Sequence, residues 1–481
     1  MQDQNDRAAC TAAIAKEGRV RVLKPGRNCW RIARADKVAV LIDSSDYYAR
    51  LEQALRQAKR SILIIGWAFD GRVKLCPDRD DCPPLRDFLR SLVEAKPELE
   101  VRILVWSAAV IHAPGDPVPL LLGAPWQNHP RITVRLDRQH PLYASHHQKL
   151  VAIDDALVFC GGIDLTIGRW DTAGHHEADP LRVRPDGSAY CPVHDVQMVA
   201  AGEAAGVAAD VARERWRIAT GEFLSAAEHG ADLWPPDLVP DFTDIPVAIA
   251  RTVPAWGDAP AVHEIAALTE DLLSAARHSI YIETQYFAAG NVRRILEKSL
   301  AAAVGPEIVV IVRRASPGVL ERLVMGSNRD RLIRHLRRID RHNRLRVFYP
   351  VVPGSDKPCE LLVHAKVVVV DEDIVRIGSS NLNNRSMGLD TECDLAVEAA
   401  NDIERRAIRQ LRERLLAEHI GVTPTEIAQA VVDRGSLIHG IDACNRNVRG
   451  LRPFPETDLD GPTEPITGTG LLDPLPPVEL L

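Results

Sequence analysis

Hydrophobic residues follow two alternating patterns along this chain. Stretches with an apolar residue every three or four positions predict amphipathic helices, and short runs that are almost wholly apolar predict buried strands. The two clearest helical stretches place apolar residues at Tyr47, Leu51, Ala54, Leu55 and Ala58, and at Ile265, Leu268, Leu272 and Ala276. Strands that are apolar on both faces and alternate with helices indicate a sheet covered by helices on both sides.

The order of these elements repeats along the chain. Three apolar runs have counterparts in the same order: 58–70 with 276–287, 101–109 with 307–316, and 131–136 with 344–349. We therefore expect an α/β fold made of two similar α/β/α sandwich halves. The expected organisation is an N-terminal extension (1–34), a first half (35–225), a crossover linker (226–254), a second half (255–420), and a C-terminal helix with a proline-rich tail (421–481).

One polar motif recurs beside an apolar run in both halves. The pattern H-x-K-x4-D occurs twice, 217 positions apart, at His147, Lys149 and Asp154, and at His364, Lys366 and Asp371. A pair of small residues follows each copy, at Gly161–Gly162 and at Gly378–Ser379. Because the copies match in all three motif residues and in the small pair, we interpret them as a true internal duplication.

Two imidazoles and two ammonium groups suit one reaction if the halves bring them face to face. A neutral imidazole can act as a nucleophile, and a protonated one can donate to a leaving group. Two ammonium groups can stabilise the charge that grows on a phosphodiester in the transition state. The residues therefore predict two in-line steps through a covalent phosphohistidine, which water or another alcohol then releases. Since the lysines supply positive charge, we expect no metal and no cofactor in this reaction.

Carboxylates are expected to fix the orientation of the histidine rings. The next predicted strand of each half offers one, Asp195 in the first half and Glu392 in the second, with Asp390 as the fallback. Just past the small pairs, Asp164 matches Asn381, and an amide there can donate to a phosphoryl oxygen. A carboxylate there cannot, unless it is protonated or pairs with a lysine. The candidate substrate-contacting residues are Asn381, Asp164, Ser379, Gln285 and Trp170, of which Trp170 could equally cap the core.

Composition narrows the class of partner. The chain of 481 residues has a formal net charge of −7, which is a poor electrostatic match for nucleic acid. No apolar run reaches the roughly 20 residues that span a bilayer. The first residues lack the basic and then apolar order of a signal peptide. We therefore expect a cytoplasmic protein, or one peripheral to a membrane.

The motifs resemble those of the phospholipase D superfamily over about residues 46–398. GGIDLTIGRWD (161–171), YIETQYF (281–287) and GSSNLNNRSMGLDTE (378–392) are similar to its membrane-lipid phospholipase D branch. The resemblance implies tandem phospholipase D folds around one shared active site. It also implies that His147 is the nucleophile and His364 the general acid and base, while Asp154 and Asp371 shape the site.

The resemblance further implies an activity. Members of this branch hydrolyse glycerophospholipids such as phosphatidylcholine to phosphatidic acid and the head-group alcohol, and many transfer the phosphatidyl group to alcohols. We therefore expect a phospholipid membrane surface as the partner, no nucleic-acid partner, and a monomer. The alternatives are a lipid synthase of the cardiolipin or phosphatidylserine type, a nuclease of the same superfamily, and an inactive binding protein on the same fold. The last is disfavoured because all four motif histidines and lysines are intact.

Overall fold

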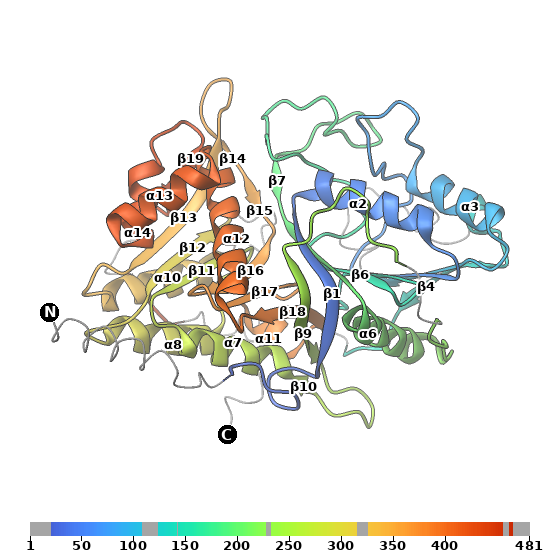
Figure 1. Ribbon diagram of the computed structural model, residues 1–481, viewed down its shortest axis with the longest axis horizontal. Helices are drawn as coiled ribbons and strands as arrows, with labels where there is room; N and C mark the ends of the chain where they lie inside the picture. The colour runs from blue at the N-terminus through green and yellow to red at the C-terminus, as the bar shows by residue number, and fades with distance from the viewer. Residues whose placement is uncertain are drawn as a thin grey trace, which may run out of the picture.

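The structure, a computed structural model, describes residues 21–107, 124–141, 143–227, 232–314, 326–455 and 461–464. Its two halves lie side by side, with the first in blue and green and the second in yellow and orange (Figure 1). The first half contains β1 (Arg31–Ile42), α2 (Ser44–Gln57), β2 (Ser61–Gly66), α3 (Leu85–Ala95), β3 (Glu100–Trp106), β4 (Ile132–Asp137), β5 (Leu150–Ile153), β6 (Leu157–Gly161), β7 (Val193–His194), β8 (Val196–Ala201) and α6 (Glu203–Thr220).

The second half repeats the order of the main sheet strands and adds further short elements and a C-terminal part. It contains β9 (Phe242–Val253), β10 (Val262–His263), α7 (Glu264–Ala275), β11 (Ser279–Thr284), α8 (Gly290–Ala301), β12 (Glu307–Val312), α10 (Ser327–Ile339), β13 (Leu345–Val352), β14 (Cys359–Glu360), β15 (Leu362–Val363), β16 (Lys366–Val370), β17 (Ile374–Gly378), α11 (Asn384–Gly388), β18 (Glu392–Glu398) and α12 (Asp402–Ile420). The C-terminal part adds α13 (Pro424–Arg434), α14 (Leu437–Cys444) and β19 (Gly450–Pro453).

The two halves have the same strand order. It is β4-β3-β2-β5-β6-β8-β1 in the first half and β13-β12-β11-β16-β17-β18-β9 in the second. Three strands of each half pair in parallel, and the others are antiparallel. The strands β1 and β9 pair antiparallel with each other, so the two sheets are joined edge to edge at the centre of the molecule.

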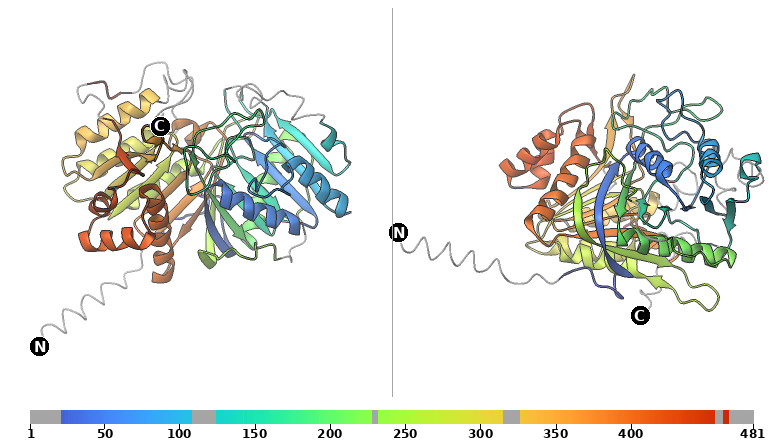
Figure 2. Two further views of the ribbon diagram at one scale, coloured as in Figure 1. Left: turned by 90° about the horizontal axis from the view of Figure 1, so that it is seen from above. Right: turned by 45° about the vertical axis from the view of Figure 1, so that its right-hand side comes forward.

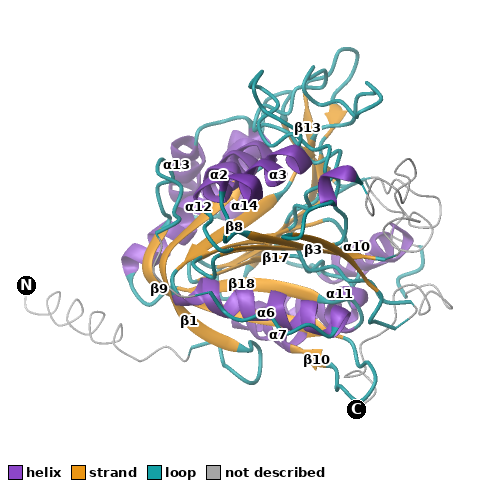
Figure 3. Cartoon of the chain, turned by 90° about the vertical axis from the view of Figure 1, so that its right-hand side faces the viewer, coloured by secondary structure: helices purple, strands orange, loops and turns teal. Residues whose placement is uncertain are grey.

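Helices cover the sheets on both sides, as the sequence predicts. Figure 3 shows the strands as a middle layer with α6 and α7 on one side and α2, α3 and α12 on the other, and the view from above in Figure 2 shows the two halves side by side. One hydrophobic core lies in the first half between its sheet, α2 and α3, and another lies in the second half between its sheet, α7, α8 and α10. A third core is shared, since it combines α6, α12 and one face of each sheet. The shared core buries the interface between the halves.

The predicted helices bury the residues that predict them. Tyr47, Leu51 and Leu55 of α2 are fully buried, and so are Ile265 and Leu268 of α7. Each helix precedes the first parallel strand of its half, which is the predicted order. Among the described residues, no helix is both long enough and apolar enough to cross a bilayer.

Two regions contain more regular structure than the sequence indicates. The stretch 226–254, expected to be a linker, contains β9, and the extension 1–34 includes the first residues of β1. Prolines obscure the β9 signal, yet Pro246 lies within the strand, opposite Arg34 of β1. After residue 420 the chain forms two helices and a strand that extends the sheet beside β13, rather than one helix. The last 17 residues of the expected tail lie outside the described part.

The motif aspartates Asp154 and Asp371 lie in the turns of the hairpins β5–β6 and β16–β17, and each connects its hairpin to the start of a neighbouring strand. Asp154 accepts hydrogen bonds at 2.7 to 2.8 Å from the backbone N–H groups of Lys59, Arg60 and Ser61, which lead into β2. Asp371 accepts equivalent bonds from the three residues that lead into β11. Each aspartate therefore satisfies backbone donors that would otherwise lack partners.

Removing one of these carboxylates should destabilise the fold. We expect Asp154→Ala to lower the free energy of unfolding by about 3 kcal/mol, because three partly buried N–H groups lose their acceptor. Urea denaturation measures this change. The control is Asp186→Ala, which removes a carboxylate from an exposed turn and should change the same quantity by less than about 0.5 kcal/mol. Equal effects of the two substitutions would contradict the role of Asp154.

Candidate active site

Two short parallel contacts bring the repeated motifs together. Strand β7 pairs in parallel with β15, so that His194 lies opposite Val363. A second contact, an isolated bridge, places His146 opposite Thr391. Each contact connects one half to the other. In both paired segments of each contact, the next residue along the sequence belongs to the predicted site. The local geometry therefore sets Asp195 beside His364 and Glu392 beside His147.

Each motif histidine is held by a carboxylate of the opposite half. His147 Nδ1 lies 3.0 Å from both oxygens of Glu392, and His364 Nδ1 lies 2.6 Å from Asp195 Oδ2. The sequence offers one candidate carboxylate in each half without assigning it to a histidine, and the parallel contacts pair each carboxylate with the histidine of the opposite half. The fallback, Asp390, instead pairs with Arg385 at 2.6 Å. Neither ring uses Nε2 in a hydrogen bond with any described residue, so both Nε2 atoms are left for a substrate.

The two lysines have different partners. Lys149 Nζ lies 3.1 Å from Asp164 Oδ2 and donates to the carbonyl oxygen of His147. Lys366 Nζ donates to the carbonyl oxygen of His364 and, at 3.4 Å, to the amide oxygen of Gln285. Lys149 therefore has a carboxylate counter-ion, whereas the hydrogen bonds of Lys366 go to neutral groups.

Burial sets the protonation of the site. It lowers the pKa of His147 well below the usual histidine range, and Lys149 and Lys366 lower it further. Burial likewise lowers the pKa of His364, together with Lys366 and Arg169. The pKa of Lys366 falls to about 7, mainly through burial, although Asp195 opposes this change. Both imidazoles are therefore neutral at neutral pH, which is the form a nucleophile needs.

The orienting carboxylates are themselves buried, and burial raises the pKa of both Asp195 and Glu392. The hydroxyl groups of Ser379 and Ser386 donate to Glu392 and favour its ionised form. The backbone N–H of Val196 donates to Asp195 at 2.8 Å.

The small pairs make room for these carboxylates. A Cβ atom on Gly162 would lie 2.0 Å from Asp195 Oδ1, so any larger residue would displace the carboxylate that holds His364. The matching residue in the second half is Ser379, whose hydroxyl donates to Glu392. In the first half Gly162 therefore leaves room for the carboxylate, and in the second half Ser379 donates a hydrogen bond to it.

The other residues predicted to contact the substrate have different surroundings in the structure. Gln285 contacts Lys366, and Ser379 lies behind Glu392 rather than facing the histidine rings directly. The side-chain oxygen of Asn381 is buried and makes no hydrogen bond with any described residue. Asp164 pairs with Lys149, and Trp170 is buried in the core of the first half.

Two further residues contribute to the site, and the sequence does not predict the first of them. Ser386, in α11, donates to Glu392 at 2.7 Å, and the segment GSSNLNNRSMG is the only local signal for it. Arg169, which follows the first motif in GRWD, lowers the pKa of both His364 and Lys366. This arginine is therefore a third cation near the rings.

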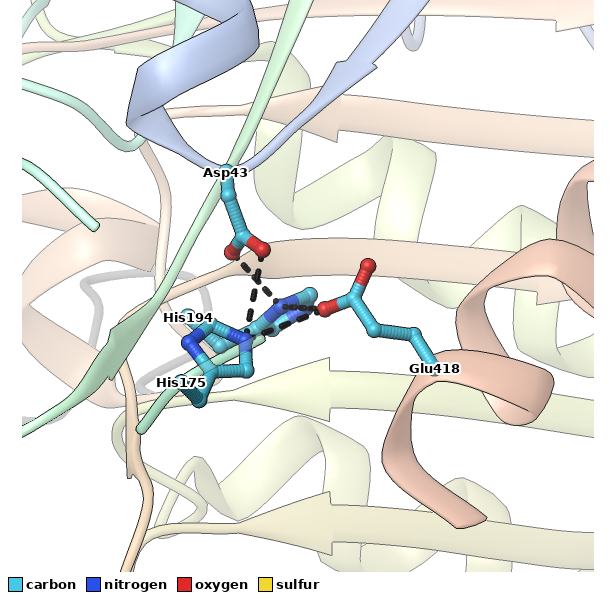
Figure 4. Close-up of side chains that lie close together, drawn as sticks. All are labelled: Asp43, His175, His194 and Glu418. Atoms are coloured by element: carbon cyan, nitrogen blue, oxygen red, sulfur yellow. Dashed lines mark hydrogen bonds and ion pairs between the residues drawn. The ribbon is translucent and has the colours of Figure 1, made fainter. Parts of the chain in front are cut away.

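A separate cluster could hold a metal ion. Asp43, His175, His194 and Glu418 point their nitrogen and oxygen atoms toward one another (Figure 4). Within the described residues, none of these four side chains hydrogen-bonds to the motif histidines or lysines.

Comparisons with known proteins show what the chain is similar to. Residues 270–415 match the protein family described as "Cardiolipin synthase, PLD-like domain". Phospholipase D A of Dictyostelium discoideum is 24% identical over 489 residues, covering 82% of this chain and 37% of that protein. Phospholipase D1 of Schizosaccharomyces pombe is 24% identical over 489 residues, covering 81% of this chain and 36% of that protein. The chain thus spans little more than a third of the length of these curated relatives.

The fold has a solved counterpart. The crystal structure of phosphatidylserine synthase from Haemophilus influenzae superimposes with a TM-score of 0.54 at 12% identity, covering 86% of this chain and 96% of that chain. This likeness concerns the fold alone. Given the duplicated motif, the site that its two copies form between the halves and the similarity to two phospholipases D over most of its length, the chain belongs to the phospholipase D superfamily.

Proposed function

We propose that this chain is a phosphodiesterase that hydrolyses membrane glycerophospholipids, such as phosphatidylcholine, to phosphatidic acid and the head-group alcohol. The same site can pass the phosphatidyl group to other alcohols. The observation that carries the proposal is the pair of motif histidines, each held through Nδ1 by a carboxylate of the other half and flanked by a lysine. Similarity to two phospholipases D supports a lipid substrate.

The first step forms a bond between phosphorus and a histidine nitrogen. His147 attacks through Nε2 while Nδ1 donates to Glu392, which stabilises the positive charge that develops on the ring. As the phosphorus–oxygen bond to the head group breaks, His364 protonates the departing oxygen. The anionic substrate raises the pKa of His364 in the complex, so this ring can carry the proton that it transfers. Lys149 and Lys366 stabilise the two free phosphoryl oxygens.

The second step reverses the roles. His364, now neutral, accepts a proton from water, and the water oxygen attacks phosphorus as the bond to His147 Nε2 breaks. The products are phosphatidic acid and the free enzyme. An alcohol in place of water gives a new phosphodiester. The side chain of His147 is 17% exposed and that of His364 is 6% exposed, which favours His147 as the ring that the phosphorus atom reaches first.

The partner we propose is the surface of a phospholipid membrane, to which the protein binds peripherally, because the substrate resides there. A monomer suffices for this reaction, since one chain supplies both histidines and both carboxylates. No nucleic-acid partner is proposed for a chain with a net charge of −7.

A second candidate function is lipid synthesis by the same chemistry. The match of residues 270–415 to a family described as "Cardiolipin synthase, PLD-like domain" favours it. In that case a lipid alcohol, rather than water, accepts the phosphatidyl group from His147. The products of the two reactions differ, so product analysis with phosphatidylglycerol as the offered acceptor separates them.

Phosphatidylcholine vesicles provide the direct test of function. We expect phosphatidic acid without added alcohol and phosphatidylethanol when ethanol is present, and lipid mass spectrometry detects both. His147→Ala and His364→Ala should each lower the rate at least about a thousandfold, because the two rings act as a unit. The control His342→Ala, at an exposed histidine outside the site, should leave the rate unchanged. Absence of both products with the unmodified chain would contradict the proposal.

Trapping the covalent intermediate tests which histidine attacks. A phosphatidyl substrate with a p-nitrophenol leaving group needs no general acid, so His364→Ala should still form the phosphoenzyme but release it slowly. Alkaline quenching and peptide mass spectrometry should then place the phosphatidyl group on His147. His147→Ala should give no such adduct. An adduct on residue 364 in the His147→Ala variant would reverse the assignment.

The pH dependence of kcat/KM tests the charge on Lys366. Its pKa is lowered to about 7 in the free protein, so the ammonium is present below that pH and is lost as the pH rises through it. We therefore expect kcat/KM to fall above about pH 7. Lys366→Arg keeps the charge at all accessible pH values and should remove this alkaline limb, even though its maximum is lower. Lys298→Arg, at an exposed lysine of α8, should keep the limb. A limb that persists unchanged in Lys366→Arg belongs to another group.

A further inference from the structure

Four potential metal ligands meet in the interior between the two halves. Asp43 lies between β1 and α2, His175 lies in the loop after β6, His194 lies in β7, and Glu418 lies in the last turn of α12. The first three side chains are fully buried and Glu418 is 11% exposed. Figure 4 shows the two rings facing both carboxylates. Three of the residues come from the first half and one from the second.

The spacing of these atoms matches that of ligands around one ion. His175 Nε2 lies 3.2 Å from both Asp43 Oδ2 and Glu418 Oε1. His194 Nδ1 lies 3.0 Å from Asp43 Oδ1 and 2.9 Å from Glu418 Oε1. Four ligands at about 2.0 Å from a tetrahedral metal are about 3.3 Å from one another, so small movements would suffice to complete the shell.

Both rings have the outer partners that metal-binding histidines require. With Nε2 toward the cluster, His175 directs Nδ1 to Asp171 at 2.9 Å. With Nδ1 toward the cluster, His194 directs Nε2 to Glu283 at 2.9 Å. A carboxylate behind each ring fixes the tautomer that leaves a lone pair on the inward nitrogen. Asp171 is held in turn by Arg182 at 3.0 Å and by the backbone N–H of Val193.

The carboxylate of Asp43 gives an independent indication of a ligand. Both of its oxygens are buried and lie at ion-pair distance, 3.0 and 3.2 Å, from the inward ring nitrogens, but neither accepts a hydrogen bond from any described residue. A fully buried carboxylate without hydrogen bonds is costly. A cation between Asp43 and Glu418 would satisfy both.

We propose that Asp43, His175, His194 and Glu418 bind one divalent transition-metal ion, with zinc the best match. Two imidazoles select a transition metal over calcium or magnesium, and two imidazoles with two carboxylates suit four-coordinate zinc. The ion's two positive charges balance the two carboxylates. Since the chain supplies all four ligands, the site is closed and structural, and the ion takes no part in the phosphodiester reaction.

The site lies where it can hold the catalytic groups in place. His194 precedes Asp195, the carboxylate that holds His364, and the carbonyl oxygen of His194 accepts from the backbone N–H of His364 at 2.8 Å. The backbone N–H of Asp43 donates to the carbonyl oxygen of Asp195 at 2.8 Å. An ion at this point would tie α12 of the second half to β1 and β7 of the first.

The rival explanation is that protons alone occupy the cluster, with both rings as imidazolium ions. Metal content distinguishes the two without any assay of activity, so the proposal stands or falls separately from the proposed function. The full chain is purified with a tag that does not bind metal and is then dialysed. Elemental mass spectrometry should then find about one zinc ion per chain. The chelated protein, refilled with Co²⁺, should show the visible absorption of tetrahedral cobalt.

Substitutions locate the ion. His175→Gln and Asp43→Asn should weaken Co²⁺ binding at least about tenfold and abolish the tetrahedral spectrum. The control is His335→Gln, which removes another histidine paired with a glutamate, Glu297 at 3.1 Å, and should leave both unchanged. Chelation should lower the Tm of the unmodified chain and of this control, and zinc should restore it.

Two results would overturn the proposal. The first is a metal content below about a tenth of an ion per chain, together with no tetrahedral Co²⁺ spectrum in the unmodified protein. The second is a full metal content in folded His175→Gln and Asp43→Asn. If those variants do not fold, the metal content and cobalt spectrum of the unmodified chain decide.

Discussion

Each motif imidazole depends on a carboxylate that the opposite half provides. The imidazoles of His147 and His364 and the two lysines are all buried or nearly so, and a buried polar or charged group without a partner is expensive. Glu392 and Asp195 make this burial tolerable, but only when the halves are docked. A single half would have a motif histidine without its partner and an orienting carboxylate without its ring. The site therefore forms only when the two halves are docked, and neither half contains a complete site by itself.

The exchange of partners also leads the two copies to differ. Lys149 has a carboxylate counter-ion in Asp164, and this residue becomes Asn381 in the second copy, where Lys366 hydrogen-bonds to the neutral Gln285. The less compensated lysine is the one whose pKa falls to about 7, chiefly because of burial. A bound phosphate would restore its charge, so Lys366 gains most from the substrate. The duplication thus gives two copies of the motif with similar backbones, and single residue differences such as Asp164 against Asn381 give the two lysines different surroundings.

Much of the fold and the identity of the central residues follow from the sequence, because they depend on patterns that are local. The periodicity of Tyr47, Leu51 and Leu55 predicts α2, and the repeat of H-x-K-x4-D locates both rings. The pairing of Asp195 with His364 could not be predicted in this way, since it depends on a two-residue contact between β7 and β15. The same reason hides β9, whose signal is interrupted by proline and whose partners are β1 and β18. Long-range pairing, rather than propensity, decides these features.

The cluster of Asp43, His175, His194 and Glu418 has no sequence signature for the same reason. Its members are separated by stretches of 131, 18 and 223 intervening residues, far from the short spacings of common zinc motifs. The two parallel contacts that set up the active site are very short, a two-residue strand pair and one isolated bridge. Contacts this short do not fix the position of an imidazole ring precisely by themselves. The surrounding backbone must also be held by other interactions. Because His194 lies in β7 itself and Glu418 reaches it from α12, an ion in this cluster would act on the strand that directly precedes Asp195. In the proposed reaction the two lysines supply the positive charge at phosphorus, and the ion proposed here would instead fix the placement of the reacting groups.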